Sequence, residues 1–265
     1  MRIGAGGIPA LAVAALLVPG LARAQMQPHH AEYSLRLGTA LNAPRIGTAV
    51  QDIALDCTGW RIRRDVSVDI ALTPSFKVGI ASRMQGEEAW NGNGFSYRAV
   101  QIQNGAERET RGEVQRKDGL SRVELVTPEG EEQVDLPPLT LMPVAAVSYA
   151  LGRLAMGAVS FPVLTFGAEA TGAAFLIEVE RPEAGAAATL PPSARHVDVP
   201  AARSWPVAMT VKRAGWPQAK PLLSMRARIF ETGVLDRLTV EAGMFTVAAY
   251  LQKLQMHEAP ACPGR

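Results

Sequence analysis

The sequence contains very few residues of the kinds that most often mark chemistry. Among 265 residues there are two cysteines and four histidines, and only five of the 27 basic side chains are lysines. No G-x-S-x-G, S-x-x-K or P-loop motif is present, and no G-x-G-x-x-G follows an expected strand. The histidines lack the H-x-x-x-H spacing of a metal site. We therefore expect no enzyme activity, no cofactor and no bound metal.

The chain also lacks a surplus of charge of either sign. It carries 27 basic and 25 acidic side chains, and no run of lysines or arginines. A nucleic-acid partner requires a basic footprint, so we expect none. At 48% apolar and 20% charged residues the composition is that of a folded globular domain, which excludes a disordered chain.

The first 24 residues have the pattern of a secretory signal peptide. Arg2 precedes an apolar stretch from Ile8 to Leu21, and Ala22-Arg23-Ala24 is an A-x-A cleavage site. The apolar stretch is shorter than the roughly 20 residues that span a bilayer. We predict cleavage after Ala24, export to the periplasm and a mature domain of residues 25–265. Cleavage leaves 25 basic and 25 acidic side chains.

A second apolar stretch runs from Leu136 to Phe166 and contains one charge, Arg153. Its length alone would allow a transmembrane helix. Prolines and glycines interrupt it, however, and a charge at the bilayer centre costs at least about 2.5 kcal/mol. We interpret the stretch as a buried helix and predict no membrane span in the mature chain.

The two cysteines, Cys57 and Cys262, are too far apart in sequence for a local metal knuckle. An exported protein folds in an oxidising compartment, where a disulfide is the default for such a pair. We predict a Cys57–Cys262 disulfide; the alternative is two free thiols.

Alternation of apolar and polar residues, typical of half-buried strands, dominates the mature chain. It is clearest in Trp60, Ile62, Val66, Val68 and Ile70, where only Arg64 breaks the pattern. Turn sequences at 91–94, 104–105, 118–119 and 129–130 predict an antiparallel meander from about 75 to 136. A change of parity between Tyr97 and Val100 predicts a bulge. The segment 245–256 suits either a strand or a short helix, and 181–193 suits a loop.

Helical periodicity occurs at one place. Val144, Val147, Leu151 and Leu154 recur at helical spacing after Pro143, which predicts a helix over about 143–156. The opposite side is nearly uncharged, so we expect the sheet to curve around this helix. The predicted fold class is mostly β: a broken, spiral-like antiparallel β-barrel of about 12–14 strands around one central α-helix.

Three groups of polar residues have both a functional and an ordinary interpretation. His29-His30 is interpreted as a frayed terminal pair. Glu87-Glu88 is interpreted as a solvated edge, because neighbouring strand residues point to opposite faces. Arg61, Arg63 and Arg64 either line an anionic site or form a solvated outer face, and we favour the solvated face.

Several blocks together resemble the cell envelope integrity EipB family of alphaproteobacterial periplasmic proteins. The likeness covers essentially the whole mature chain. The blocks are His29-x-Ala31-x-Tyr33-x-Leu35, Cys57-Thr58-Gly59-Trp60, Leu136-Pro137-x-x-Thr140-x-x-Pro143, Trp205-Pro206-Val207, Glu231-x-Gly233-Val234 and the tail ending in Cys262.

The resemblance implies a spiral-like β-barrel around one helix, similar in outline to periplasmic lipoprotein carriers. It also implies a disulfide between the early strand and the tail, and a non-enzymatic role in maintaining the cell envelope.

Three hypotheses follow about function. The first is a periplasmic envelope-integrity protein that acts through binding, with either another periplasmic envelope protein or an apolar or lipid ligand as its partner. The second is a carrier of a lipid or other apolar ligand in the concave cavity of the open barrel, with Ala145, Ala146 and Tyr149 as possible cavity-lining residues. The third is a periplasmic hydrolase, for which no nucleophile is visible.

Overall fold

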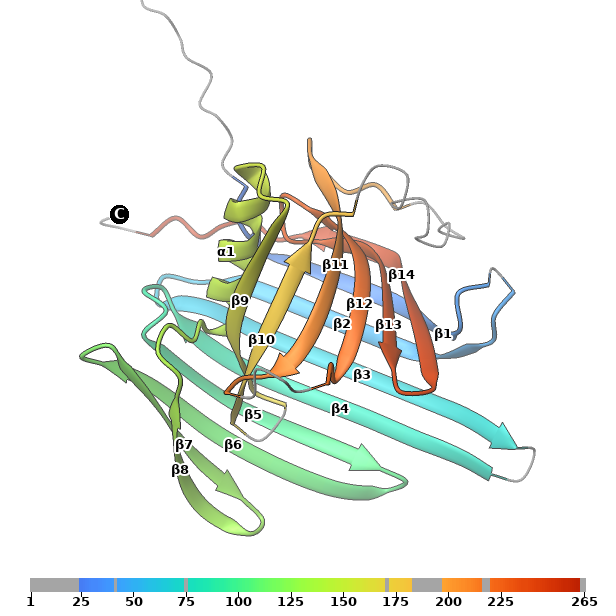
Figure 1. The fold of residues 1–265 in the computed structure, drawn as a ribbon, viewed down its shortest axis with the longest axis horizontal. Coiled ribbons are helices and arrows are strands. Elements are labelled where there is room, and N and C mark those ends of the chain that lie inside the picture. The colour runs from blue at the N-terminus through green and yellow to red at the C-terminus, as the bar shows by residue number, and fades with distance from the viewer. Residues whose placement is uncertain are drawn as a thin grey trace, which may run out of the picture.

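The computed structural model contains one antiparallel sheet of fourteen strands and one α-helix in its described residues (Figure 1). It describes residues 24–40, 42–73, 76–169, 172–182, 197–215 and 220–262. The predicted fold class, with about 12–14 antiparallel strands and one helix, is confirmed. The predicted signal peptide, except Ala24, and most of the predicted 181–193 loop lie outside the described residues.

Strands account for most of the chain. They are β1 (His29–Leu37), β2 (Arg45–Leu55), β3 (Gly59–Thr73), β4 (Phe76–Ala89), β5 (Gly94–Gln103), β6 (Ala106–Lys117), β7 (Leu120–Thr127), β8 (Gly130–Leu136), β9 (Ser160–Gly167), β10 (Ala173–Glu180), β11 (Ser204–Arg213), β12 (Leu223–Phe230), β13 (Leu235–Ala242) and β14 (Phe245–Met256). The helix α1 (Pro143–Ala155) lies between β8 and β9 in the chain.

The strand order explains the open shape of the sheet. The order is β8-β7-β6-β5-β4-β3-β2-β1-β14-β13-β12-β11-β10-β9, so the first and last strands of the chain are neighbours in the middle. The two edges are β8 and β9, which are not paired, and the sheet is not closed. In Figure 1 strands β9–β14 fold over β1–β5, and α1 stands beside β9. The segment that carries α1 therefore joins the two free edges.

The hairpin turns behave as their sequences predict. Asn104 and Gly105 both have positive φ, at 49° and 86°, and so do Asp118 and Gly119, at 52° and 78°. Two consecutive residues of positive φ form the turn whose twist matches that of antiparallel strands. The meander predicted from 75 to 136 is confirmed as β4–β8.

Three predictions about strands need correction or completion. No bulge occurs in β5: its register with β4 and β6 is continuous, and Val100 is simply buried on the face opposite Tyr97. The ambiguous segment at the C-terminus is strand β14, because it pairs with β1 and β13. His29 and His30 are not frayed, because they pair with β2 and β14, which hold the beginning of β1 from both sides.

The helix prediction is confirmed with a shift of one residue at its C-terminal end. Leu151 and Leu154 are buried and pack with Phe161, Val163 and Val179 of the neighbouring strands. The interpretation of the whole 136–166 stretch as helix is wrong. Gly157, with a φ of 86°, ends the helix. The last part of the stretch forms β9, in which pairing with β10 holds the backbone extended.

The described part of the chain contains one α-helix, α1. None of the helical residues there forms a segment long and apolar enough to cross a bilayer.

Candidate functional site

The cysteine pair fastens the C-terminal tail to the turn between β2 and β3. Cys57 and Cys262 form a disulfide with their Cα atoms 5.5 Å apart, across 205 positions of sequence. The turn is itself fixed, since the Asp56 carboxylate accepts hydrogen bonds from the backbone of Thr58 and Gly59. The predicted disulfide is present, in the position that the resemblance implied.

A buried acid from β4 caps the helix. The N-cap position of α1 is Met142, whose side chain provides no hydrogen bond, and the first turn contains no acid. Glu88 lies beneath it, 3% exposed, and accepts hydrogen bonds from the backbone N–H groups of Val144 and Ala145 at 2.6 and 2.8 Å. A side chain 56 residues earlier thus satisfies two of the N–H groups that a helix start leaves open.

The placement of Glu88 corrects the prediction of a solvated acidic edge. Glu87 is exposed on the outer face, whereas Glu88 points inward between Trp60 and Phe95, its partners on β3 and β5. Burial raises the pKa of Glu88 to about 7, against the opposing effect of the two backbone hydrogen bonds. The carboxyl group therefore changes charge near neutral pH inside the core.

We expect Glu88→Gln to change the pH dependence of stability. Because the pKa is raised in the folded protein, Glu88 favours folding most when protonated, below pH about 4.5, and this contribution is lost as pH rises through about 7. At acid pH the variant should be less stable by about 1 kcal/mol, because an amide accepts fewer hydrogen bonds from the helix. With rising pH the wild type should lose its advantage in the free energy of unfolding and become the less stable protein. The reason is that ionising the buried carboxyl costs up to about 3 kcal/mol.

Denaturant unfolding of both proteins across this pH range measures the difference. Glu87→Gln, on the neighbouring exposed residue, is the matched control and should shift the curve little. A wild type that became more stable relative to Glu88→Gln as pH rose would contradict the prediction. It would mean that the helix stabilises the Glu88 anion more than burial destabilises it.

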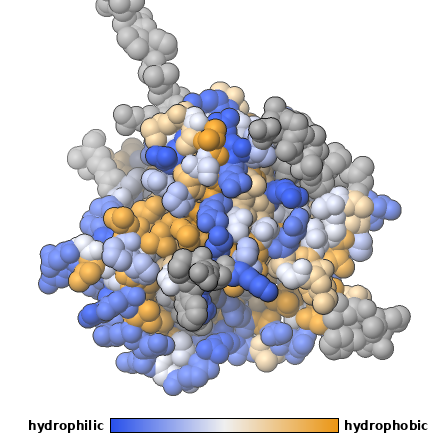
Figure 2. Space-filling model, viewed as in Figure 1, coloured by the Kyte–Doolittle hydropathy of each residue, from blue (hydrophilic) through white to orange (hydrophobic). Residues whose placement is uncertain are grey.

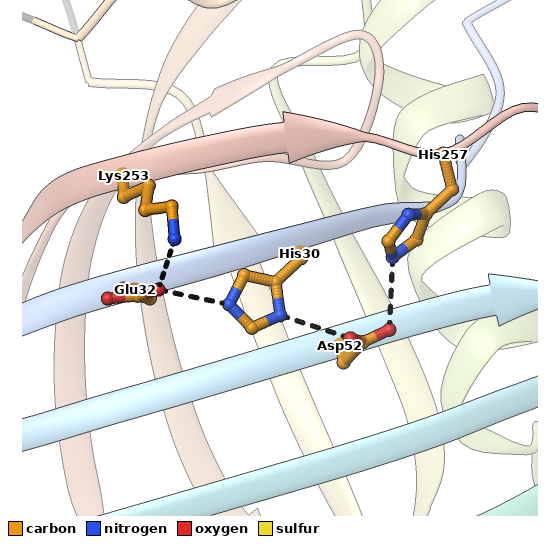
Figure 3. Close-up of polar contacts among 5 residues, drawn as sticks. All are labelled: His30, Glu32, Asp52, Lys253 and His257. Carbon is orange, nitrogen blue, oxygen red and sulfur yellow. Dashed lines mark hydrogen bonds and ion pairs between the residues drawn. The ribbon is translucent and has the colours of Figure 1, made fainter.

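A polar network lies on the outer face where β1, β2 and β14 meet (Figure 3). The Asp52 carboxylate contacts two imidazoles: His30 Nδ1 lies 3.0 Å from Oδ2, and His257 Nε2 lies 3.1 Å from Oδ1. His30 Nε2 also lies 3.3 Å from Glu32 Oε1, and Lys253 Nζ donates a hydrogen bond to the same oxygen at 3.1 Å. The network ties the first strand to the tail that carries the disulfide.

His30 lies between two acids of the network. Both of its ring nitrogens face carboxylates, which accept hydrogen bonds only, and a neutral imidazole has a single N–H. Burial acts to raise the pKa of Asp52, but the hydrogen bonds from His30 and His257 outweigh it, and the pKa lies below its usual value. The described residues contain no group of three or more His, Cys, Asp or Glu placed to hold a metal ion.

The three arginines of β3 are divided between two faces. Arg64 points inward and pairs with Glu169 at 3.4 Å, which explains how one charge interrupts the apolar face of β3. Arg61 and Arg63 lie on the outer face, and Arg61 pairs with Asp56 at 3.1 Å.

A surface depression of about 380 Å³ crosses β2, β3 and β4 on this outer face. Its lining consists of Asp52, Ala54, Arg61, Ile62, Arg63, Gln85, Gly86 and Glu87. A neighbouring depression of about 420 Å³ shares Gln85, Gly86 and Glu87 and continues over β5–β7. The outer face of the meander is thus both charged and hollowed.

The helix residues predicted to line a cavity do not lie together. Ala146 is buried in the packed core beside α1, and Ala145 is half-buried. Tyr149 is exposed, with its ring edge-on to Phe161 at 6.3 Å. None of the three lines either surface depression, and their role in ligand binding stays a prediction.

Sequence reasoning missed the cap by Glu88 and the network around Asp52. The alternation along β4 was the available signal for the burial of Glu88. Glu88 lies four positions after the buried Met84, and residues an even number of positions apart share a face of the strand. No such signal existed for Asp52 and His257, which lie 205 positions apart and meet only through the pairing of β1 with β2 and β14.

These features define a class of protein: an open antiparallel β-barrel with one helix at its seam and a disulfide-tethered tail. A crystal structure of a β-barrel-like protein of the domain of unknown function DUF1849 from Brucella abortus has this fold, with a TM-score of 0.72. The two chains are 17% identical, and the match covers 88% of this chain and 99% of the other.

The chain belongs to the EipB-like family, whose model matches residues 21–258. The resemblance read from the sequence blocks is therefore confirmed. No curated protein matches the chain.

Proposed function

We propose that this chain is a non-enzymatic periplasmic protein that contributes to cell envelope integrity by binding another envelope protein. Membership of the EipB-like family supports the envelope role. The disulfide supports export, because such bonds persist in oxidising compartments.

The observation that carries a binding role is a concentration of exposed apolar side chains at the seam. Leu139, Tyr149, Met156 and Val159 are 84%, 42%, 74% and 70% exposed and all belong to the segment that joins the free edges β8 and β9. Figure 2 shows hydrophobic residues gathered around β9 and the segment preceding α1. Contiguous exposed apolar surface marks interaction sites in soluble proteins.

The backbone at Leu139 supports the same interpretation. Its φ of 67° is in the left-handed region, which is rare for a bulky residue. Conformations of this kind cost of order 1–3 kcal/mol and gather at functional positions. Here the strained turn presents a leucine to solvent, where it contributes little to folding.

A complementation experiment tests the proposal. Deleting the gene in the bacterium that encodes it should increase sensitivity to detergent and cell-wall antibiotics, and the wild-type gene should restore resistance. Leu139→Ser combined with Val159→Ser should fold normally but fail to complement. Leu120→Ser, on an exposed leucine of β7, is the matched control and should complement.

A chain lacking residues 2–24 should also fail to complement, because it would stay in the cytoplasm. Unchanged sensitivity in the deletion strain, or full complementation by the double variant, would contradict the proposal.

The open edge between β8 and β9 favours the carrier of an apolar ligand as the second candidate function. Lipid extraction from the purified protein followed by mass spectrometry distinguishes the two. A copurifying lipid in near-stoichiometric amount would support the carrier, whereas its absence would favour the protein partner.

A further inference from the structure

We propose that the outer depression across β2, β3 and β4 binds a short peptide through its two charged ends. The Arg63 guanidinium would donate hydrogen bonds to the terminal carboxylate of the peptide. The Glu87 carboxylate would accept hydrogen bonds from its terminal ammonium. The proposal concerns a surface away from the seam and does not depend on the envelope role.

The side chains of Arg63 and Glu87 lack partners although other charged residues surround them. Arg61, which directly faces Glu87 across β3 and β4, is instead engaged by Asp56 at 3.1 Å. In the described part of the chain the side chain of neither Arg63 nor Glu87 makes a hydrogen bond or an ion pair. The depression thus offers one free cation and one free anion.

Arg63 has an acid opposite it on β2 but makes no ion pair with that acid. Its cross-strand neighbour on β2 is Asp52, the natural partner for an arginine in that position. Both carboxylate oxygens of Asp52 are already occupied, one by His30 and the other by His257 (Figure 3). In this arrangement Asp52 makes its contacts with the two imidazoles and none with the Arg63 guanidinium.

The spacing of Arg63 and Glu87 suits a ligand of the length of a dipeptide. Arg63 lies opposite Gln85 on β4, and Glu87 is two residues farther along that strand. Diagonal neighbours of this kind are separated by about 7–8 Å, and an extended dipeptide spans about 7 Å. Gln85, Ile62 and Gly86 also line the depression. The Ile62 side chain is buried on the inner face and Gly86 has no side chain, so neither residue fills the space above the strands.

The charges of the depression select the class of ligand. Asp52 and Glu87 repel a dianion such as phosphate, and Arg61 and Arg63 repel a polyamine. A ligand with one charge of each sign matches both groups. The planar guanidinium of Arg63 can form a pair of parallel hydrogen bonds with the terminal carboxylate of such a ligand.

Titration of the full exported chain with alanyl-alanine, followed by amide chemical shifts, tests the proposal. We expect saturable shifts at Ala54 and Gly86, which line the depression. N-acetylated and C-amidated alanyl-alanine each lack one charge and should bind at least about tenfold more weakly, the loss of one charge-assisted hydrogen bond. Glycerophosphoethanolamine, which carries the charges of a lipid headgroup, should also bind more weakly.

Two variants connect each charge to its side chain. Arg63→Gln should weaken binding of alanyl-alanine and abolish the preference for the free carboxylate over the amide. Glu87→Gln should likewise weaken binding of alanyl-alanine and abolish the preference for the free ammonium over the N-acetylated end. Arg83→Gln is the matched control, because Arg83 is an exposed arginine of β4 outside the depression.

Three results would overturn the proposal. The first is no saturable shift at Ala54 or Gly86. The second is equal binding of the capped peptides to the wild type. The third is binding of glycerophosphoethanolamine as tight as that of alanyl-alanine, which would assign the depression to a lipid headgroup. Because the readout is binding in vitro, failure here leaves the complementation result unaffected.

Discussion

Leu151→Asp should prevent the protein from folding, and Leu151→Ala should lower the free energy of unfolding by about 2–5 kcal/mol. Leu151 is fully buried where α1 packs against the strands that follow it. Alanine leaves a cavity among these side chains. Aspartate places a charge in the same space without a partner, which costs more than a domain of ordinary stability can lose.

Thermal and denaturant unfolding of the purified variants measure both effects. Tyr149→Ala and Tyr149→Asp are the matched controls, since Tyr149 lies on the exposed side of the same helix. They should cost much less than the changes at Leu151. A folded Leu151→Asp protein with near wild-type stability would contradict the packing of α1 against the sheet.

Loss of the disulfide should produce the second large effect. Cross-linking positions 205 residues apart removes chain entropy from the unfolded state, worth at most about 5 kcal/mol by the loop-closure formula. Cys57→Ser and Cys262→Ser should lower the melting temperature by similar amounts. The double variant should add little, because each single change already removes the same bond.

Ala261→Ser, an exposed neighbour of Cys262 in the tail, is the control and should have almost no effect. Hydrogen exchange gives a local test: without the disulfide the tail after Met256 should lose protection. Additive losses in the two single variants, or two titratable thiols in the unreduced denatured protein, would contradict the bond.

The elements of this fold could be predicted because each depends on a local pattern. Alternation in β3, the turns at Asn104-Gly105 and Asp118-Gly119, and helical spacing after Pro143 all act within a few residues. Where local signals conflicted, the prediction was wrong. The change of parity in β5 suggested a bulge, yet the register is continuous, and Val100 is buried on the face opposite Tyr97.

The candidate site was less predictable because its residues meet only through pairing of distant strands. Arg61, Arg63 and Glu87 were all noticed in the sequence, but not that they line one depression or that Arg63 would be left unpaired. Asp52, opposite Arg63 on β2, instead contacts His257, whose position follows from β14 pairing with β1.

By itself, the sequence determined the fold class, the single helix, the cysteine pair and the family. Each of these follows from composition, short-range periodicity or the identity of a few residues. The tertiary structure alone decided which charges are buried, paired or free. Glu88 and Glu87 are adjacent and chemically identical, yet one caps a helix in the core and the other faces solvent. The reason is that a side chain's energy depends on its desolvation and on partners brought from other strands, and neither is encoded in its own neighbours along the chain.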